Sequence, residues 1–239
     1  MLAIDKLLYV HWLRHGEVAS HQGDIPLTSQ GRRQVIEAGQ RLGEEIASNE
    51  QVFLLHAPTR RTYETATLLH HSMSEVLVNT QPPKPVLHAP DEERAIRNPD
   101  IYVAGKRVEL VSSPEALAEQ FPLDTLNVGE LRSIDFWQDF WSTRDRIGFW
   151  VNHPDPPGED ANAVARRFMA FALSLLDLPR VRPRRYICVT HSPIMRAFLR
   201  YYLLQSDPGE PEYGESVDLT IHNEYVEIRF REESKIIIL

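Results

Sequence analysis

Cysteine is almost absent from this chain of 239 residues, since it occurs only once, at Cys188. A single cysteine excludes an intramolecular disulfide framework, and such a chain is expected in the reducing cytoplasm. The sequence also lacks long apolar runs, because no stretch reaches the roughly 18 residues that a membrane-spanning helix needs. The first six residues have neither the basic start nor the cleavage site of a secretory signal. We therefore expect a cytoplasmic protein that is not anchored in a membrane.

Lysine is scarce, since it accounts for 4 of the 26 lysine and arginine residues. Acidic residues outnumber these basic residues, and the formal net charge is −8. A negative chain of this kind argues against general binding to nucleic acid or to an anionic membrane, although a small cationic pocket can still lie within it. Apolar residues make up 42% and charged residues 25% of the chain, as in ordinary globular proteins. The composition predicts a folded chain, and a homodimer is compatible with it.

Strand-like and helix-like segments alternate along much of the chain. The strand-like runs are residues 7–13, 51–56, 86–88 and 185–190. Helical patterns or helix-start signals follow at about 28–46, 58–70, 159–176 and 193–204. This alternation is typical of βαβ units, and the alternating tail at 216–221 and 225–230 predicts antiparallel edge strands. We predict a three-layer α/β/α sandwich with a mostly parallel central sheet.

The alternation weakens between about residues 90 and 157. A hairpin is predicted at 101–110 and helices near 113–121 and 133–150. This stretch is too long to be a simple loop. We therefore expect a single domain over 1–239 with an inserted cap at about 90–157 that covers the carboxyl ends of the strands. The loop at 210–212, Glu-Pro-Glu, is interpreted as an ordinary polar loop.

Two of the strand-like runs end in a histidine. The first leads into Arg14, His15 and Gly16, and the second leads into His191. Because the carboxyl ends of parallel strands form the ligand crevice of open α/β sheets, the two imidazoles are expected to meet there. An arginine beside a histidine favours a bound anion, since guanidinium matches phosphate oxygens and repels a metal ion. A neutral imidazole can attack phosphorus and hold it covalently.

The same residues resemble a known family. Residues 13–17, Leu-Arg-His-Gly-Glu, and 26–31, Pro-Leu-Thr-Ser-Gln-Gly, are similar to the signature of the histidine phosphatase superfamily, the phosphoglycerate mutase-like proteins. Residues 57–66 resemble the family's Ser-Pro-x-x-Arg-x-x-x-Thr-Ala segment, which aligns Arg61 with the catalytic arginine. Residues 158–160 resemble its Gly-Glu-Ser, and residues 189–192 its Val-Ser-His-Gly.

The resemblance implies a phosphohistidine mechanism without a cofactor or metal. His15 is the implied nucleophile, and Arg14, Arg61 and His191 surround the phosphoryl oxygens. Glu93 is the implied proton donor, because the family places glutamate directly before an arginine-like residue at this point, and the neighbouring Glu92 is its alternative. The residues expected to contact the substrate are Gly16, Glu17, His21, Thr28, Arg94 and Ser192.

The chain departs from the family at three places that concern the substrate. His21 stands where many members have asparagine, Ala57 stands where serine is usual, and Ser192-Pro193 replaces the glycines that often follow the second histidine. These changes disfavour a glycolytic mutase. Arg60 is interpreted as a solvated helix residue. Six further histidines are interpreted as structural, namely His11, His56, His70, His71, His88 and His153.

The leading hypothesis is thus a metal-independent phosphatase that hydrolyses a small phosphorylated metabolite through phosphohistidine on His15. A phosphoglycerate mutase-type phosphotransferase is the alternative, and it differs in shielding the phosphoenzyme from water. A non-catalytic phospho-ligand binding module is disfavoured because the four expected phosphoryl-binding side chains are present. A metal hydrolase is disfavoured by the flanking arginines.

Overall fold

The structure, a computed structural model, describes residues 7–20, 23–78, 80–122, 126–177 and 182–239. Its centre is a sheet in the order β10-β9-β8-β1-β7-β2-β3, with β4 paired to the end of β2. The parallel strands are β1 (Leu8–Arg14), β7 (Arg184–Thr190), β2 (Gln51–His56), β3 (Val86–Leu87) and β4 (Asp91–Glu92). Strands β1 and β7 are buried along almost their whole length, as expected of parallel strands covered on both faces.

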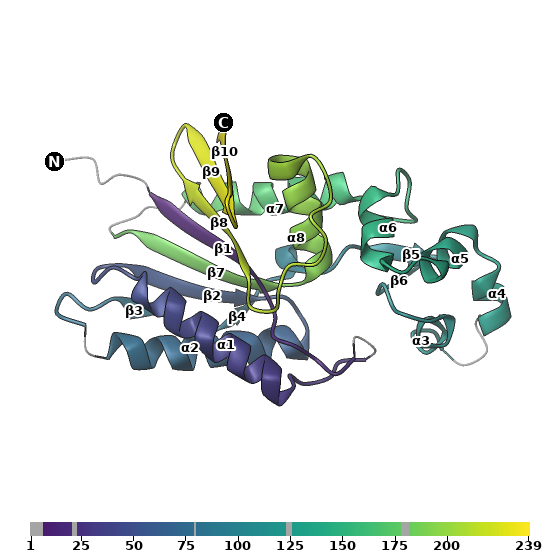
Figure 1. Cartoon of the computed structure of the whole chain (residues 1–239), viewed down its shortest axis with the longest axis horizontal. Coiled ribbons are helices and arrows are strands. Elements are labelled where there is room, and N and C mark those ends of the chain that lie inside the picture. Colours follow the sequence, from purple (N-terminus) through teal and green to yellow (C-terminus); the bar gives the residue numbers. More distant parts are fainter. Residues whose placement is uncertain (1–6, 21–22, 79, 123–125, 178–181) are drawn as a thin grey trace.

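Helices cover both faces of this sheet (Figure 1). Helices α1 (Ser29–Glu44) and α2 (Arg60–Leu77) pack on one face, and α7 (Ala161–Ser174) and α8 (Ser192–Leu199) pack on the other. Side chains that recur at helical spacing on α1, such as Val35, Ala38 and Leu42, are buried as the sequence predicts. The predicted α/β fold class with a mostly parallel sheet is confirmed.

The antiparallel side of the sheet is built from the C-terminal tail. It consists of β8 (Ser216–Ile221), β9 (Tyr225–Phe230) and β10 (Glu233–Ile238), and β8 pairs directly with β1. The first two strands agree with the sequence prediction. The third was not predicted, because the run Glu-Ser-Lys-Ile-Ile-Ile does not alternate and its side chains are mostly exposed. Its pairing with β9 alone places it at the edge.

A separate group of short elements lies beyond the carboxyl ends of the parallel strands, at the right of Figure 1. It consists of β5 (Ile101–Val103), β6 (Lys106–Val108), α3 (Pro114–Ala118), α4 (Val128–Arg132), α5 (Asp135–Ser142) and α6 (Arg146–Asn152). A short 3-10 helix, η1 (Arg94–Ile96), connects it to β4. We call residues 90–157 the cap segment, and its position next to the strand ends places it beside the histidines.

The prediction of one helix in the cap segment is wrong. Instead of a single helix near 133–150, the chain forms α5 and α6 with a break at residues 143–145. Thr143 has extended backbone, and the Asp145 carboxylate accepts a hydrogen bond from the Gly148 N–H at 2.9 Å, which caps α6. Trp137 and Trp150 are fully buried within the cap segment, so these tryptophans serve its packing.

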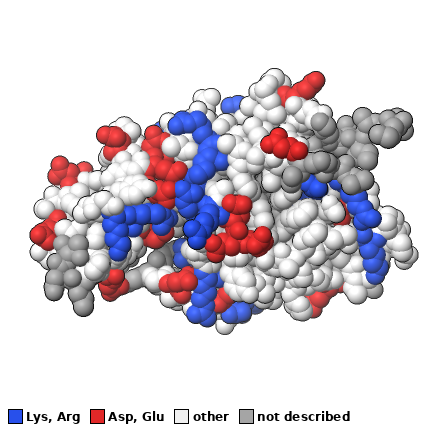
Figure 2. Space-filling model, turned by 180° about the vertical axis from the view of Figure 1, so that it is seen from behind, with Lys and Arg blue, Asp and Glu red and all other residues white. Residues whose placement is uncertain are grey.

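No helix among the described residues is long and apolar enough to span a bilayer. On the face shown in Figure 2, basic side chains gather in a band across the middle, and acidic side chains lie directly beside them. This face therefore presents no broad surface of a single sign.

Candidate active site

His15 and His191 lie side by side because their strands are neighbours. Arg14 on β1 is in register with Thr190 on β7, and the His15 N–H donates to the Thr190 carbonyl at 3.1 Å. The two imidazole rings meet edge to face, with centroids 5.3 Å apart and planes at 68°. Each residue is only 2% exposed. The predicted meeting of the two imidazoles is thus present in the structure.

The tautomer of His15 follows from one hydrogen bond. Nδ1 lies 2.7 Å from the carbonyl oxygen of Gly16, and a carbonyl can only accept, so Nδ1 carries the proton. In the neutral ring the lone pair is then on Nε2. The backbone thereby fixes both the ring orientation and the nitrogen that is able to attack an electrophile.

The loop that follows His15 is packed tightly against the start of α1. A Cβ on Gly16 would lie 2.7 Å from the Gly31 carbonyl oxygen, and a Cβ on Gly31 would lie 2.3 Å from the Glu17 carbonyl oxygen. Thr28 caps α1 by accepting from the Gly31 N–H at 2.9 Å, and its hydroxyl donates to the Glu17 carboxylate at 2.9 Å. The motif residues Gly16, Glu17 and Thr28 therefore hold the backbone around His15 in place.

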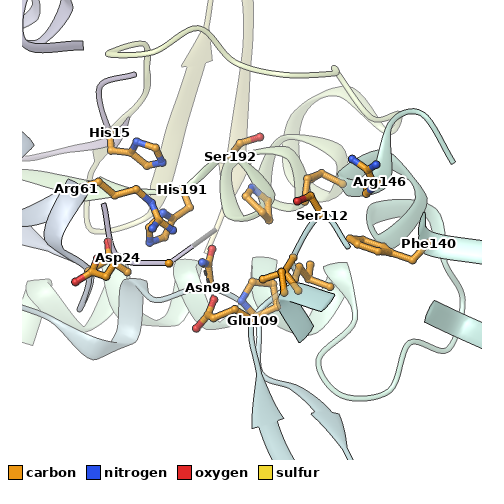
Figure 3. Close-up of a pocket in the computed structure, with 18 of the residues that line it drawn as sticks. His15, Asp24, Arg61, Asn98, Glu109, Ser112, Phe140, Arg146, His191 and Ser192 are labelled. Atoms are coloured by element: carbon orange, nitrogen blue, oxygen red, sulfur yellow. Dashed lines mark hydrogen bonds between the residues drawn. The ribbon is translucent and has the colours of Figure 1, made fainter. Parts of the chain in front are cut away.

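Arg61 is a buried cation in the first turn of α2. It is 8% exposed, its Nε is buried without a hydrogen-bond partner, and no carboxylate lies within ion-pair distance of it among the described residues. Burial lowers the pKa of its guanidinium, although the negative charges of Glu109 and Asp24 partly offset this. Figure 3 shows Arg61 next to His15 and His191. A buried charge without an ion pair is costly, so this position favours an anionic ligand.

Arg14 is held differently, by the loop that precedes β8. Its guanidinium pairs with the Glu210 carboxylate at 3.1 Å, donates to the Pro211 carbonyl and lies 4.0 Å from the centre of the Tyr213 ring. The loop at 210–212, interpreted from the sequence as an ordinary polar loop, therefore holds the Arg14 guanidinium in place. This pairing could not be predicted, because Glu210 is distant from Arg14 along the chain and belongs to none of the motifs.

These side chains line one cavity of about 980 Å³. Arg14, His15, Arg61, His191 and Ser192 are all part of its wall. His191 is the N-cap of α8, so the N-terminal end of that helix also faces the cavity and adds positive potential there. The hydroxyl oxygen of Ser192 is buried and has no hydrogen-bond partner within the described part of the chain. The arrangement suits a bound tetrahedral anion.

The other predicted site residues lie elsewhere. The Glu93 carboxylate accepts from the Ala95 N–H at 2.7 Å, while its own N–H donates to the His56 carbonyl at the end of β2. The exposed Arg94 pairs weakly with Glu92 at 3.5 Å. Neither Glu93 nor Arg94 is among the described residues that line the cavity. His21 lies outside the described residues.

Several cavity residues were missed by sequence reasoning. Asp24, Asn98 and Glu109 all face the cavity (Figure 3). Asn98 Nδ2 donates to the Glu109 carboxylate at 2.9 Å, and Arg107 donates to its other oxygen at 2.8 Å. Asn98 and Glu109 come from the cap segment, which carries no motif. Among the residues that the structure describes, no cluster of three or more His, Cys, Asp or Glu side chains could hold a metal ion.

The residues that resemble the family's Gly-Glu-Ser segment have a structural role. Glu159 is bound by the Arg167 guanidinium at 2.9 and 3.0 Å and accepts from the Asp100 N–H at 2.9 Å. Asp160 caps α7. Gly158 has a φ of 142°, and a Cβ there would lie 2.1 Å from the Asp100 carbonyl oxygen. This segment joins the end of the cap segment to α7.

Comparison with known proteins agrees with the geometry. Residues 10–82 match the histidine phosphatase superfamily (branch 1). The resemblance to the histidine phosphatase superfamily is confirmed. This matched stretch contains the loop of His15, the start of α1 and Arg61, whereas His191 lies outside it.

Similarity in fold to solved structures extends over nearly the whole chain. One is the product of an open reading frame of Mycobacterium tuberculosis, with 19% identity, a TM-score of 0.52, and coverage of 97% of this chain and 96% of that one. A second is a mycobacterial glucosyl-3-phosphoglycerate phosphatase, with 16% identity, a TM-score of 0.53 and 90% coverage of both chains. A third is a phosphoglycerate mutase from Bacillus anthracis, with 13% identity, a TM-score of 0.53, and coverage of 98% and 93%. No curated protein is similar enough in sequence to be matched.

Proposed function

We propose that this protein is a metal-independent phosphatase that hydrolyses a low-molecular-weight phosphomonoester through a phosphohistidine on His15. The observation that carries the proposal is that two buried imidazoles, His15 and His191, lie against each other next to the buried guanidinium of Arg61, which has no ion pair among the described residues. A cationic pocket around a fixed lone pair is what phosphoryl transfer requires.

In the first step, His15 Nε2 attacks phosphorus, an N–P bond forms, and the bond from phosphorus to the alcohol oxygen breaks. Glu93 donates its proton to the departing oxygen, so a neutral alcohol leaves. In the second step, Glu93 accepts a proton from water, the water oxygen attacks phosphorus, and the N–P bond breaks to release phosphate. Arg14, Arg61 and His191 stabilise the charge on the phosphoryl oxygens in both steps.

Glu93 needs a small movement to act in this way, because its carboxylate now accepts from the Ala95 N–H. Its backbone stands beside the end of β2, next to the strand ends that carry the histidines. Rotation of the side chain away from η1 exchanges that one hydrogen bond for a bond to the leaving oxygen. Glu92, the alternative donor, is exposed and pairs with Arg94.

The size of the cavity favours hydrolysis over mutase activity. A phosphoryl group occupies a small part of a cavity of about 980 Å³, so water can reach the phosphoenzyme once the alcohol has left. A mutase must exclude that water while the intermediate reorients.

The test is labelling with a radiolabelled phosphomonoester in the presence of EDTA, quenched with an alkaline denaturant. The chain should retain a label that is stable in alkali and lost in acid, and should release phosphate, whereas His15→Gln should do neither. His56→Gln is a matched control, because His56 also ends a strand, is buried and has Nδ1 bound to the next carbonyl, at 2.9 Å, yet does not line the cavity. Turnover that survives in His15→Gln rejects the proposal. Label that persists until an acceptor alcohol is added identifies a phosphotransferase instead.

A further inference from the structure

The cavity is much larger than the phosphoryl site at its end. Ligand pockets span about 300–1,000 Å³, and the upper part of that range holds molecules of drug size. At about 980 Å³, the cavity is near that upper limit. Figure 3 shows that it extends from His15, Arg61 and His191 at one end to Phe140 and Arg146 of the cap segment at the other. The occupant must therefore reach from the strand ends into the cap segment.

Between the two ends, the wall on the side of the cap segment carries a group of apolar side chains, with polar ones such as Ser112 and Gln120 beside them. The apolar side chains come from the turn after β6 and from α3, α5 and α6. They are Leu110, Val111, Ala116, Phe140 and Ile147. Leu110 and Ile147 are only partly buried by the protein itself. Apolar side chains of this kind contribute binding energy for an aliphatic or aromatic body.

The far end carries an arginine with an unused donor. Arg146 begins α6, and its Nε is buried without a hydrogen-bond partner among the described residues. Two of the cap-segment carboxylates that line the cavity are engaged by other groups. Asp145 is bound at both oxygens by Arg196, and Glu109 is bound by Asn98 and Arg107. Arg146 thus remains available to an acceptor on a ligand.

On the basis of the proposed phosphatase function, we infer that the substrate is an elongated phosphomonoester with an apolar body and a second anionic group, such as a carboxylate, at its far end. The phosphate lies between His15 and Arg61, the body lies along Leu110 and Ile147, and the second anion binds Arg146. The cap segment thereby selects the alcohol, and the strand ends carry out the reaction.

The apolar body is tested with alkyl phosphates of increasing length, from ethyl to decyl, below their aggregation limits. Each buried methylene adds about fourfold in binding, so kcat/KM should rise at least tenfold along the series. Leu110→Asn should remove most of this rise and should change kcat/KM for ethyl phosphate by less than about twofold. Leu110→Met should keep the rise. Equal kcat/KM for all lengths, or an equal loss on ethyl and decyl phosphates in Leu110→Asn, overturns the inference.

The second anion is tested with ω-carboxyalkyl phosphates, their methyl esters and the corresponding ω-amines. The acid should be preferred, and Arg146→Gln should lower its kcat/KM about tenfold, as for the loss of one charge-assisted hydrogen bond, without affecting the ester. Arg132→Gln is the matched control, because Arg132 is an exposed arginine of the cap segment that does not line the cavity. Preference for the amine, or an equal effect of Arg146→Gln on acid and ester, contradicts the assignment.

Binding separates this inference from the proposed function. The non-hydrolysable phosphonate analogues of the same compounds are titrated into the protein by calorimetry. One outcome is that the affinity of the phosphonates rises with chain length and with the carboxylate, while no phosphate is released from any ester. This outcome supports the inferred ligand-binding cavity and rejects only the proposed phosphatase activity. Phosphate release from ethyl phosphate with no dependence on length or carboxylate supports the phosphatase and rejects only the inference.

Discussion

The guanidinium of Arg196 on α8 binds both carboxylate oxygens of Asp145, at 2.9 and 2.6 Å. Asp145 is the N-cap of α6, so this pair joins the helix behind the candidate site to the helix that carries Arg146. Arg196 is fully buried, and it also pairs with Asp207 and with Glu210 at 2.9 Å. Since Glu210 in turn binds Arg14, a continuous chain of charged groups connects the cap segment to the motif arginine.

The first prediction concerns this chain of charges. Arg196→Met leaves three carboxylates close together without their cation, and removal of one partner from a buried pair costs about 3–5 kcal/mol. We expect a loss in the free energy of unfolding of about 3 kcal/mol, measured with urea. Arg200→Met is the control, because Arg200 directly follows α8 and, among the residues that the structure describes, makes one longer side-chain hydrogen bond, to Asn162 at 3.3 Å. A loss below about 1 kcal/mol in Arg196→Met would show that the carboxylates rearrange at little cost.

The second prediction concerns two adjacent arginines with different surroundings. Arg61 is buried in the cavity wall, whereas Arg60 is exposed and pairs with Glu64 at 2.9 Å. Arg61→Gln should lower kcat/KM on a phosphomonoester by about a hundredfold to a thousandfold, because it removes a fixed donor to the phosphoryl oxygens. Arg60→Gln should change it by less than about twofold. Similar losses in the two variants would place the phosphate elsewhere.

The third prediction distinguishes the two candidate proton donors. Glu93→Gln should lower kcat by about a hundredfold or more on an alkyl phosphate, because the alkoxide that leaves needs a proton. The loss should be much smaller on para-nitrophenyl phosphate, whose leaving group is stable as an anion. Glu92→Gln should leave both rates nearly unchanged. If the substrate-dependent loss occurs in Glu92→Gln instead, Glu92 is the donor.

The fourth prediction concerns pH and the hairpin of the cap segment. The hydrogen bond from Arg97, at 3.1 Å from its Nε, and a further bond from Arg107 lower the pKa of Asp100 from 3.8 to about 2. Folding thus weakens proton binding, so the stabilisation is complete above pH 3.8 and is lost as the pH falls towards about 2. Its size, allowing for partial exposure, is about 1–2 kcal/mol.

Asp100→Asn abolishes this pH dependence. The difference in the free energy of unfolding between the chain and Asp100→Asn should therefore be smaller at about pH 3 than at about pH 6. Urea titrations at the two pH values measure it. A difference that stays constant between them would mean that Asp100 has the same pKa in the folded and unfolded chain.

The parts of the fold and site that the sequence predicts are those fixed by short-range patterns. Strands β1 and β7 are continuous apolar runs, so their ends, and with them His15 and His191, could be placed from the sequence. Arg61 was predicted from a motif, and the structure shows the physical reason for its position, which is that the first turn of α2 begins next to the cavity.

The parts that could not be predicted depend on contacts between distant residues. Nothing in the sequence around Glu210 indicates that its carboxylate meets Arg14. The break between α5 and α6 depends on Asp145, which caps α6 and is itself bound by Arg196 from a distant helix. The lining of the cap segment is equally hidden, because Leu110 and Arg146 belong to separate short elements without periodicity.

The groups proposed to act on phosphorus arise from the ends of β1 and β7, the start of α2 and Glu93 beside β4, whereas the far wall of the cavity arises from one continuous insertion between η1 and α7. Chemistry and selectivity are therefore encoded in separate stretches of the gene. An exchange of the insertion for one of different shape would redirect the protein to another alcohol while the reacting groups kept their positions, which makes this segment the natural target for re-engineering its specificity.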